Sequence, residues 1–271
     1  MVLMSGKPAR AKATEGASAS PVDDRSVAAR LFAILDAFTS PPATALTLTA
    51  IARRSGIPLS TAHRLVAEWV TWGGLARQDD GRFTLGMRLW EVGVQTPTAR
   101  NLRTIALPYL EDLYETTREH VHLAVLDGRD ALYLEKLSGH QAVRVISRVG
   151  GRLPLHATGV GLVLLAHASA TVIQDYLAEP LQRFLPQTMT APEKLRRRLA
   201  GIRSQGIVRM SEEMTAGSSS LAAPIRDRTG QVVAAVSIVT HTSPVRGPEQ
   251  EQAVRVAAQG VSRALGYRRA S

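Results

Sequence analysis

Residues 48–66 constrain the fold of this chain most, because they combine an apolar stripe, a glycine and a polar face. Apolar residues recur there at i, i+3, i+4 and i+7, the spacing of one helix face: Ala62, Leu65, Val66 and Trp69. Gly56 can adopt the left-handed conformation that ends a helix, and the fixed φ of Pro58 suits the first turn of the next one. The pattern predicts a helix-turn-helix at about residues 46–65, whose second helix enters the major groove of DNA.

The polar face of the second helix carries hydrogen-bond donors and no acid, and no Asp or Glu lies between Asp36 and Glu68. Arg64 can donate two hydrogen bonds to a guanine or can hold a phosphate. The helix start attracts phosphate through its free backbone N–H groups. The alternative is an ordinary solvated face of a helical hairpin. We expect the DNA contacts of this motif to come from Arg53, Arg54, Ser60, Thr61, His63 and Arg64.

The flanking segments extend this motif to a winged helix-turn-helix domain over residues 24–86. Residues 25–38 form an amphipathic helix pattern, and Gly73 with Gly74 ends the helix expected over 58–72. Short extended runs flank Asp79-Asp80-Gly81, and an Asp-Gly between such runs is a strong hairpin signal. We expect Arg77 and Arg82 to lie on this hairpin, the wing, and to reach DNA phosphates.

The second half of the chain predicts an α+β domain. A helical stretch over 86–118, broken near Pro97, supplies a linker helix at 87–103, and the second domain follows at 104–271. Apolar residues then alternate as in strands, so we expect a largely antiparallel sheet with strands at 122–126, 131–135, 142–146, 219–225 and 232–239. Helical patterns fall at 159–168, 170–178, 191–205 and 248–267.

The composition limits the class of protein. At 271 residues and 45% hydrophobic, the chain can bury two cores, and its formal charge of +10 suits a polyanionic partner. It contains no cysteine, and no apolar run is long enough to span a bilayer. Residues 1–23 lack the apolar core of a secretory signal, and we interpret them as a flexible tail. We expect a cytoplasmic protein without a membrane partner.

Catalytic and metal motifs are weak. Gly159-Val160-Gly161 lacks the third glycine of a dinucleotide motif, and the chain has no Gly-x-Ser-x-Gly elbow or Walker loop. His120 and His122, two apart in an expected strand, could chelate a metal, but no third ligand is evident. Glu212 and Glu213 are sequence neighbours that point different ways, so we expect structural roles for them, and we expect Arg196-Arg197-Arg198 to be a solvated helix face. We predict no enzyme, no cofactor and no metal site.

The order of several motifs resembles the IclR family of bacterial transcription regulators. They are residues 48–65, 83–86, 153–161, 212–213 with Gly217, 222–225 and 234–238. The resemblance implies a GAF-like C-terminal domain, a homodimer or dimer of dimers, and a small effector, often a carboxylate or an aromatic metabolite.

Matching residue by residue, the resemblance places Leu153, Gly159, Val160, Ser220 and Ser237 in the effector pocket. The glycines let backbone amides open toward a carboxylate, and a glycine turn packed on the sheet is the alternative. His156 shapes the pocket or makes a structural hydrogen bond. The chain departs from common family residues at Leu162 (often Lys), Ser220 (often Cys) and Val239 (Ser in some members), which predicts a pocket of altered polarity.

These observations predict a ligand-responsive regulator that binds double-stranded operator DNA and controls a metabolic or catabolic operon. A repressor is favoured over an activator, and a small organic acid or aromatic metabolite is the expected effector. The alternative is a constitutive architectural DNA-binding protein whose C-terminal domain only oligomerises.

Overall fold

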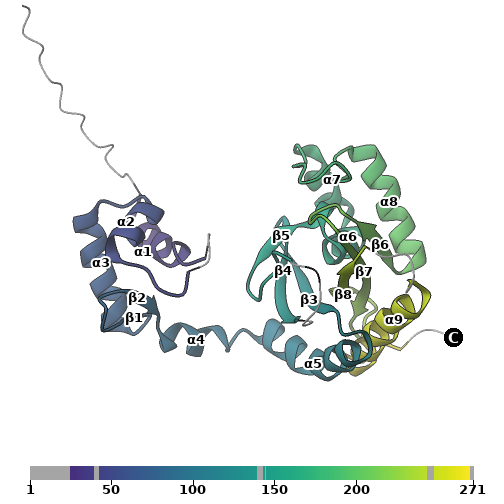
Figure 1. Cartoon of the computed structure of the whole chain (residues 1–271), viewed down its shortest axis with the longest axis horizontal. Coiled ribbons are helices and arrows are strands. Elements are labelled where there is room, and N and C mark those ends of the chain that lie inside the picture. Colours follow the sequence, from purple (N-terminus) through teal and green to yellow (C-terminus); the bar gives the residue numbers. More distant parts are fainter. Residues whose placement is uncertain (1–24, 40–42, 139–142, 144, 243–246, 269–271) are drawn as a thin grey trace, which may run out of the picture. The chain divides into compact units, whose positions relative to one another are not determined.

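The computed structural model describes residues 25–39, 43–138, 143, 145–242 and 247–268, which form two compact units that divide after Glu91 (Figure 1). The predicted tail, residues 1–23, lies outside the described residues. No helix within the described residues is both long and apolar enough to cross a membrane.

The first unit is a winged helix-turn-helix, as predicted. Its elements are α1 (Val27–Asp36), α2 (Leu48–Ser55), α3 (Leu59–Trp72) and the antiparallel pair β1 (Leu75–Arg77) and β2 (Phe83–Leu85). Thr47 caps α2 by accepting a hydrogen bond from the N–H of Ala50 at 3.2 Å. Gly56 ends α2 at φ +65°, the left-handed region that favours glycine. Pro58 immediately precedes α3 instead of forming its first turn, with ψ 141°.

The core of this unit lies between the three helices and the wing. Its fully buried large side chains are Ile34, Ile51, Leu65 and Leu75. The indole N–H of Trp69 in α3 donates to the backbone oxygen of Leu31 in α1 at 3.1 Å. These contacts hold α3 so that the side of the helix opposite to its apolar stripe faces solvent.

Two helices connect the units along the chain, with the break near Pro97 that the sequence predicts. They are α4 (Met87–Gly93) and α5 (Pro97–Thr117). α5 continues beyond residue 103, the predicted end of the linker helix, because Leu102, Ala106 and Leu110 are buried against the sheet of the second unit. α5 is therefore an integral part of that unit's core.

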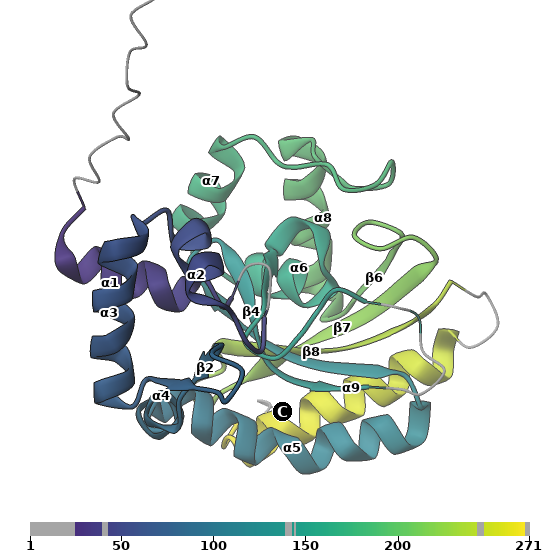
Figure 2. The ribbon, with the colours of Figure 1, turned by 60° about the vertical axis from the view of Figure 1, so that its left-hand side comes forward.

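The second unit is built on a six-stranded antiparallel sheet among its described residues, in the order β5-β4-β3-β8-β7-β6. The strands are β3 (His120–Asp127), β4 (Asp130–Leu137), β5 (Arg152–Pro154), β6 (Val208–Ser211), β7 (Ser218–Arg226) and β8 (Val232–His241). One face is covered by α6 (Gly159–Ala166), with α7 (Ala170–Ala178) and α8 (Pro192–Gln205) beside it. α5 and α9 (Gly247–Ala264) cover the other face (Figure 2).

Strand alternation divides the sheet into two apolar layers. Val121 and Leu123 of β3 belong to the cluster that packs against α5 and α9. Ala124 of β3 and Ala222 of β7 belong to the cluster around α6. Small side chains on this second face let α6 approach the sheet closely, which positions its first residues over the strands.

The predicted strand at 142–146 is wrong in its described part: residues 143, 145 and 146 form no strand. Val143 is buried, and its backbone oxygen contacts the ring of His120. Val145 faces a cavity described below. The alternating apolar residues cover the sheet face as a loop and do not form a ladder. β6, which the sequence pattern did not predict, pairs with β7.

Candidate functional site: an α3 surface and a cavity below α6

The outer side of α3 is open to solvent. Ser60, His63 and Arg64 are exposed and Thr61 is half-buried. α3 has no side-chain cap, and its first backbone hydrogen bond in the described residues runs from the N–H of Ala62 to the oxygen of Pro58. The preceding N–H groups therefore stay available at the positive end of the helix dipole, where a phosphate binds favourably.

The other basic residues predicted to contact DNA differ in what holds them. Arg53 in α2 and Arg77 in β1 are exposed. Arg54 is half-buried and donates to the backbone oxygen of Ala37 at 3.0 Å, which ties α2 to the end of α1. Arg82 forms an ion pair with Asp80 at 2.6 Å, and this guanidinium lowers the pKa of the Asp80 carboxyl. The charge of Arg82 is thus partly offset within the wing.

A narrow cavity of about 50 Å³, or about 460 Å³ when its open mouth is counted, lies between the start of α6 and the sheet of the second unit. Five of the six residues predicted to bind an effector line it: Leu153, Gly159, Val160, Ser220 and Ser237. Val239 lines it as well. The structure therefore brings together residues that lie far apart in the sequence.

The register of three strands explains this convergence. His122 of β3 lies directly opposite Ser237 of β8, and Ser220 of β7 lies opposite Val239 of β8. Ser220 and Ser237 are thus diagonal neighbours on one face of the sheet, within roughly 7–8 Å between backbones. No described residue hydrogen bonds to either hydroxyl, so both can donate to a bound molecule.

The start of α6 supplies further donors. The Thr158 hydroxyl accepts a hydrogen bond from the N–H of Gly161 at 3.2 Å, and its backbone oxygen accepts from Leu162. The N–H groups of Gly159 and Val160 have no partner among the described residues, and both residues line the cavity. Two backbone donors and two serine hydroxyls therefore surround the same space, a combination that suits a carboxylate.

His122 is a cavity residue that the sequence suggested only as a weak metal ligand. Its Nε2 lies 2.8 Å from the Ser147 hydroxyl, and its ring meets Tyr133 edge-on, with ring centroids 5.2 Å apart. Burial, with smaller effects of Lys136 and His120, lowers the pKa of His122 to about 3. The imidazole is therefore neutral at physiological pH and can exchange a hydrogen bond with a polar group on a ligand.

The remaining lining is largely apolar and comes mainly from a loop and two strand ends that the sequence did not connect with the site. It includes Val145, Ile146, Met210 and Met214. No group of three or more metal-binding side chains occurs among the residues that the structure describes. His122 lies beside Ser237 because β3 pairs with β8 in this register, and the sequence alone did not predict that pairing.

Two residues singled out by sequence lie outside the cavity. The ring of His156 contacts the Tyr176 hydroxyl at 2.7 Å and the backbone oxygen of Gln182 at 2.9 Å, so it makes the structural hydrogen bonds that were the alternative. Leu162 is fully buried in the core around α6. Leu162 does not line the cavity, so the structure does not support the altered pocket polarity that was predicted from this residue.

The predicted solvated face at residues 196–198 is wrong for Arg198. Arg196 and Arg197 are exposed, but the guanidinium of Arg198 pairs with the buried carboxylate of Glu213 at 2.8 Å. Their side chains are only 19% and 7% exposed. This pair ties α8 to the segment before β7, beside the cavity residue Met214, which gives Glu213 the structural role expected of it.

Comparison with known proteins covers both units. Residues 27–80 match the IclR helix-turn-helix domain, and residues 94–263 match the C-terminal domain of the bacterial transcriptional regulator IclR. The chain is 36% identical over 245 residues to the HTH-type transcriptional regulator XynR of Escherichia coli, covering 88% of this chain and 96% of that protein. It is 33% identical over 195 residues to the transcriptional repressor IclR of Escherichia coli, covering 70% and 71% of the two chains.

A solved structure is also similar to this chain. It is an IclR homolog from Microbacterium hydrocarbonoxydans in complex with 4-hydroxybenzoate. The two chains share 43% identity and superpose with a TM-score of 0.83, covering 89% of this chain and 99% of the homolog.

Proposed function

The chain belongs to the IclR family of DNA-binding transcriptional regulators. From this membership we propose that it is a repressor, and that an aromatic carboxylate either lowers or raises its affinity for operator DNA. The observation that carries the proposal is the cavity with four donors at one end and apolar walls. The proposed DNA-binding surface of the protein is the solvent side of α3. It comprises Ser60, Thr61, His63 and Arg64, with further contacts from Arg53 and Arg77. The repressor role is supported by the similarity to the repressor IclR.

The ligand class follows from the lining. The N–H groups of Gly159 and Val160 and the hydroxyls of Ser220 and Ser237 suit a carboxylate, and Val145, Met210 and Met214 suit an aromatic ring. The neutral His122 and Ser147 offer a partner to a ring hydroxyl. The similar structure with bound 4-hydroxybenzoate supports this class.

We further propose that the protein acts as a homodimer, which a palindromic operator requires. The first unit exposes large apolar side chains that water contacts unfavourably: Phe32 (62% exposed), Met87 (68%) and Trp90 (62%). A dimer interface would bury them. Sedimentation of the wild type and of Met87→Glu with Trp90→Glu tests this, because the variant should shift toward monomer.

Thermal unfolding with 4-hydroxybenzoate, benzoate and cyclohexanecarboxylate tests the ligand class. A ligand at a hundred times its Kd should raise the Tm by about 5–10 °C. The Ser220→Ala, Ser237→Ala double variant should lose most of this shift and keep its affinity for operator DNA without ligand. If no aromatic acid stabilised the wild type, the cavity would not be an effector site, and a constitutive DNA-binding protein would be favoured.

A further inference from the structure

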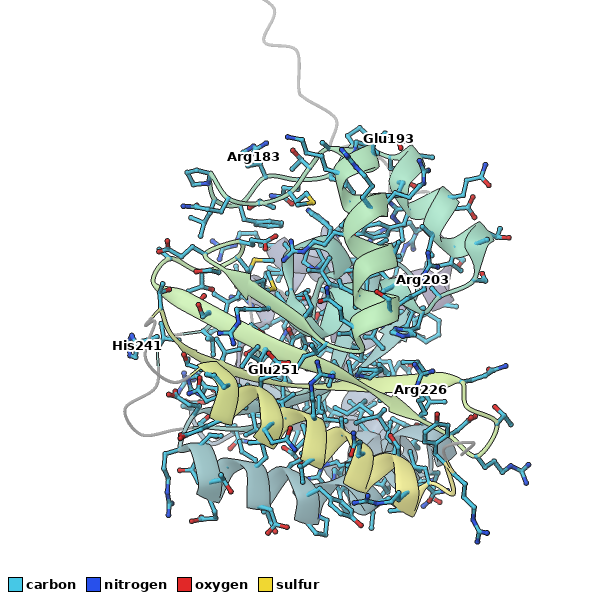
Figure 3. The ribbon with its side chains drawn as sticks, turned by 90° about the vertical axis from the view of Figure 1, so that its right-hand side faces the viewer. Arg183, Glu193, Arg203, Arg226, His241 and Glu251 are labelled. Atoms are coloured by element: carbon cyan, nitrogen blue, oxygen red, sulfur yellow. The ribbon has the colours of Figure 1, made fainter. Side chains whose placement is uncertain are left out.

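A second hollow in the C-terminal unit is lined by arginines and has no assigned role. It measures about 670 Å³, or about 1520 Å³ when its open mouth is counted, and lies between the end of α8, the end of β7 and α9. Five guanidinium groups line it, from Arg203, Arg226, Arg255, Arg263 and Arg268. None of the described lining residues is Asp or Glu. Figure 3 shows Arg203 and Arg226 on the same side of this unit. We call this hollow the arginine groove.

Two of these arginines are fixed in place by the fold. Arg226 donates to the backbone oxygen of Gly230 at 2.9 Å and contacts Nε2 of His167 at 3.3 Å. Arg255 donates to the backbone oxygen of Gln205 at 3.1 Å and pairs with Glu251 at 2.9 Å. Arg226 has further N–H groups available, because a guanidinium carries five. The groove therefore contains at least one cation that is already oriented.

The other arginines have no ion pair or hydrogen bond among the described residues. Arg203 is in the last turn of α8, Arg263 is in the last turn of α9, and both are exposed. Like charges around one hollow repel each other, and a bound anion removes that cost. The charge of Arg255 is offset by Glu251, which leaves several cations of the groove without a compensating carboxylate.

We propose that the arginine groove binds a small molecule carrying two or more linked phosphate groups. A phosphate offers three acceptor oxygens, so one group can bond to more than one guanidinium, whereas a carboxylate offers two oxygens. Several cations spread over three elements need more than one such group. A hollow also fits a small molecule better than it fits the convex surface of a duplex. This site is separate from the cavity below α6, which shares no lining residue with it.

His167 does not line the groove but contacts Arg226, so its titration can report on binding there. Its Nδ1 donates to the backbone oxygen of Val163 at 2.9 Å, so its Nε2 is the atom that accepts from Arg226. Burial, and then the charges of Arg226 and Arg203, lower the pKa of His167. A polyanion beside these arginines offsets their charge and raises that pKa.

Calorimetric titration of the full-length protein with sodium triphosphate at about 0.15 M salt tests the proposal. The groove variant is Arg203→Gln with Arg263→Gln. Its matched control is Arg196→Gln with Arg197→Gln, which removes the same charge from exposed positions of α8 outside the groove. We expect the groove variant to bind triphosphate at least about tenfold more weakly and the control to stay within about twofold of the wild type.

In nuclear magnetic resonance titrations at a triphosphate concentration near the Kd of the wild type, the pKa of His167 should rise in the wild type and the control, and should rise much less in the groove variant, because fewer of its sites are occupied. Equal loss of binding in both variants would indicate non-specific attraction and overturn the proposal. Unchanged binding in the groove variant would place the phosphates elsewhere on the protein. Citrate that bound as tightly as triphosphate would contradict the preference for phosphate.

Discussion

Gly159 and Ser220 approach each other so closely that a Cβ atom at position 159 would lie 2.5 Å from the Ser220 hydroxyl oxygen. Real Cβ contacts are longer, so a larger residue would force the serine away from the cavity. Gly159→Ala should therefore weaken aromatic carboxylate binding at least about tenfold, by displacing one donor and tightening the space. Calorimetry measures this. Gly201→Ala is the control, because its added methyl on α8 would meet no other atom within 4 Å.

Arg64 on α3 is exposed and has no partner among the described residues. Arg64→Ala should cost about 1–3 kcal/mol of operator binding, measured by gel shift with DNA from upstream of the gene. A guanine contact predicts relaxed specificity at one base pair, whereas a phosphate contact predicts a salt slope lower by about one. Arg82→Ala is a matched control with a smaller loss, because Asp80 already offsets that charge. Wild-type affinity in Arg64→Ala would remove Arg64 from the interface.

The Arg198–Glu213 ion pair is largely buried, so removing one partner leaves a charge without compensation. Glu213→Gln should cost about 3 kcal/mol, the lower end of what broken buried pairs cost, because Arg198 keeps some contact with solvent. This corresponds to a Tm lower by about 6–12 °C for a unit of this size. Glu193→Gln, which breaks the exposed pair with Arg196, should cost less than about 0.5 kcal/mol. Equal losses in the two variants would contradict the buried pair.

His122 connects stability to pH. Its pKa is 6.5 in the unfolded chain and about 3 in the folded protein, so the unfolded state binds more protons between these values. Stability from the neutral ring is complete above pH 6.5 and is lost as pH falls toward 3, by up to about 1.4 kcal/mol per pH unit. Urea unfolding of His122→Gln should show a shallower pH slope than the wild type. A His122 resonance that titrated between pH 6 and 7 would contradict this.

The helix-turn-helix was predictable because its signals are local. Gly56 ends α2 and the Asp79-Asp80-Gly81 turn closes the wing, and neither depends on distant residues. The sequence did not predict the ion pair between Asp80 and Arg82. Asp80 is a typical turn residue whose carboxylate accepts a backbone hydrogen bond, and that role does not indicate which side chain it also pairs with.

The cavity was only partly predictable, because it depends on strand register. Ser220 and Ser237 were identified through the family resemblance, and no local pattern placed them together. His122 looked like a possible metal ligand because alternation shows which residues share a face but not which strand lies beside them. His156 lies in the same motif as Gly159, but its ring contacts the Tyr176 hydroxyl and the backbone oxygen of Gln182.

β3 carries His122 on one face and Val121 and Leu123 on the other, where they pack in the cluster that includes α5. α5 is also the segment through which the chain arrives from the DNA-binding unit. A ligand that displaces β3 on its cavity face must therefore strain the packing behind it as well. Under the function proposed above, a change at the cavity would therefore need to cross only the backbone of β3 to reach α5, the helix that follows the DNA-binding unit in the chain.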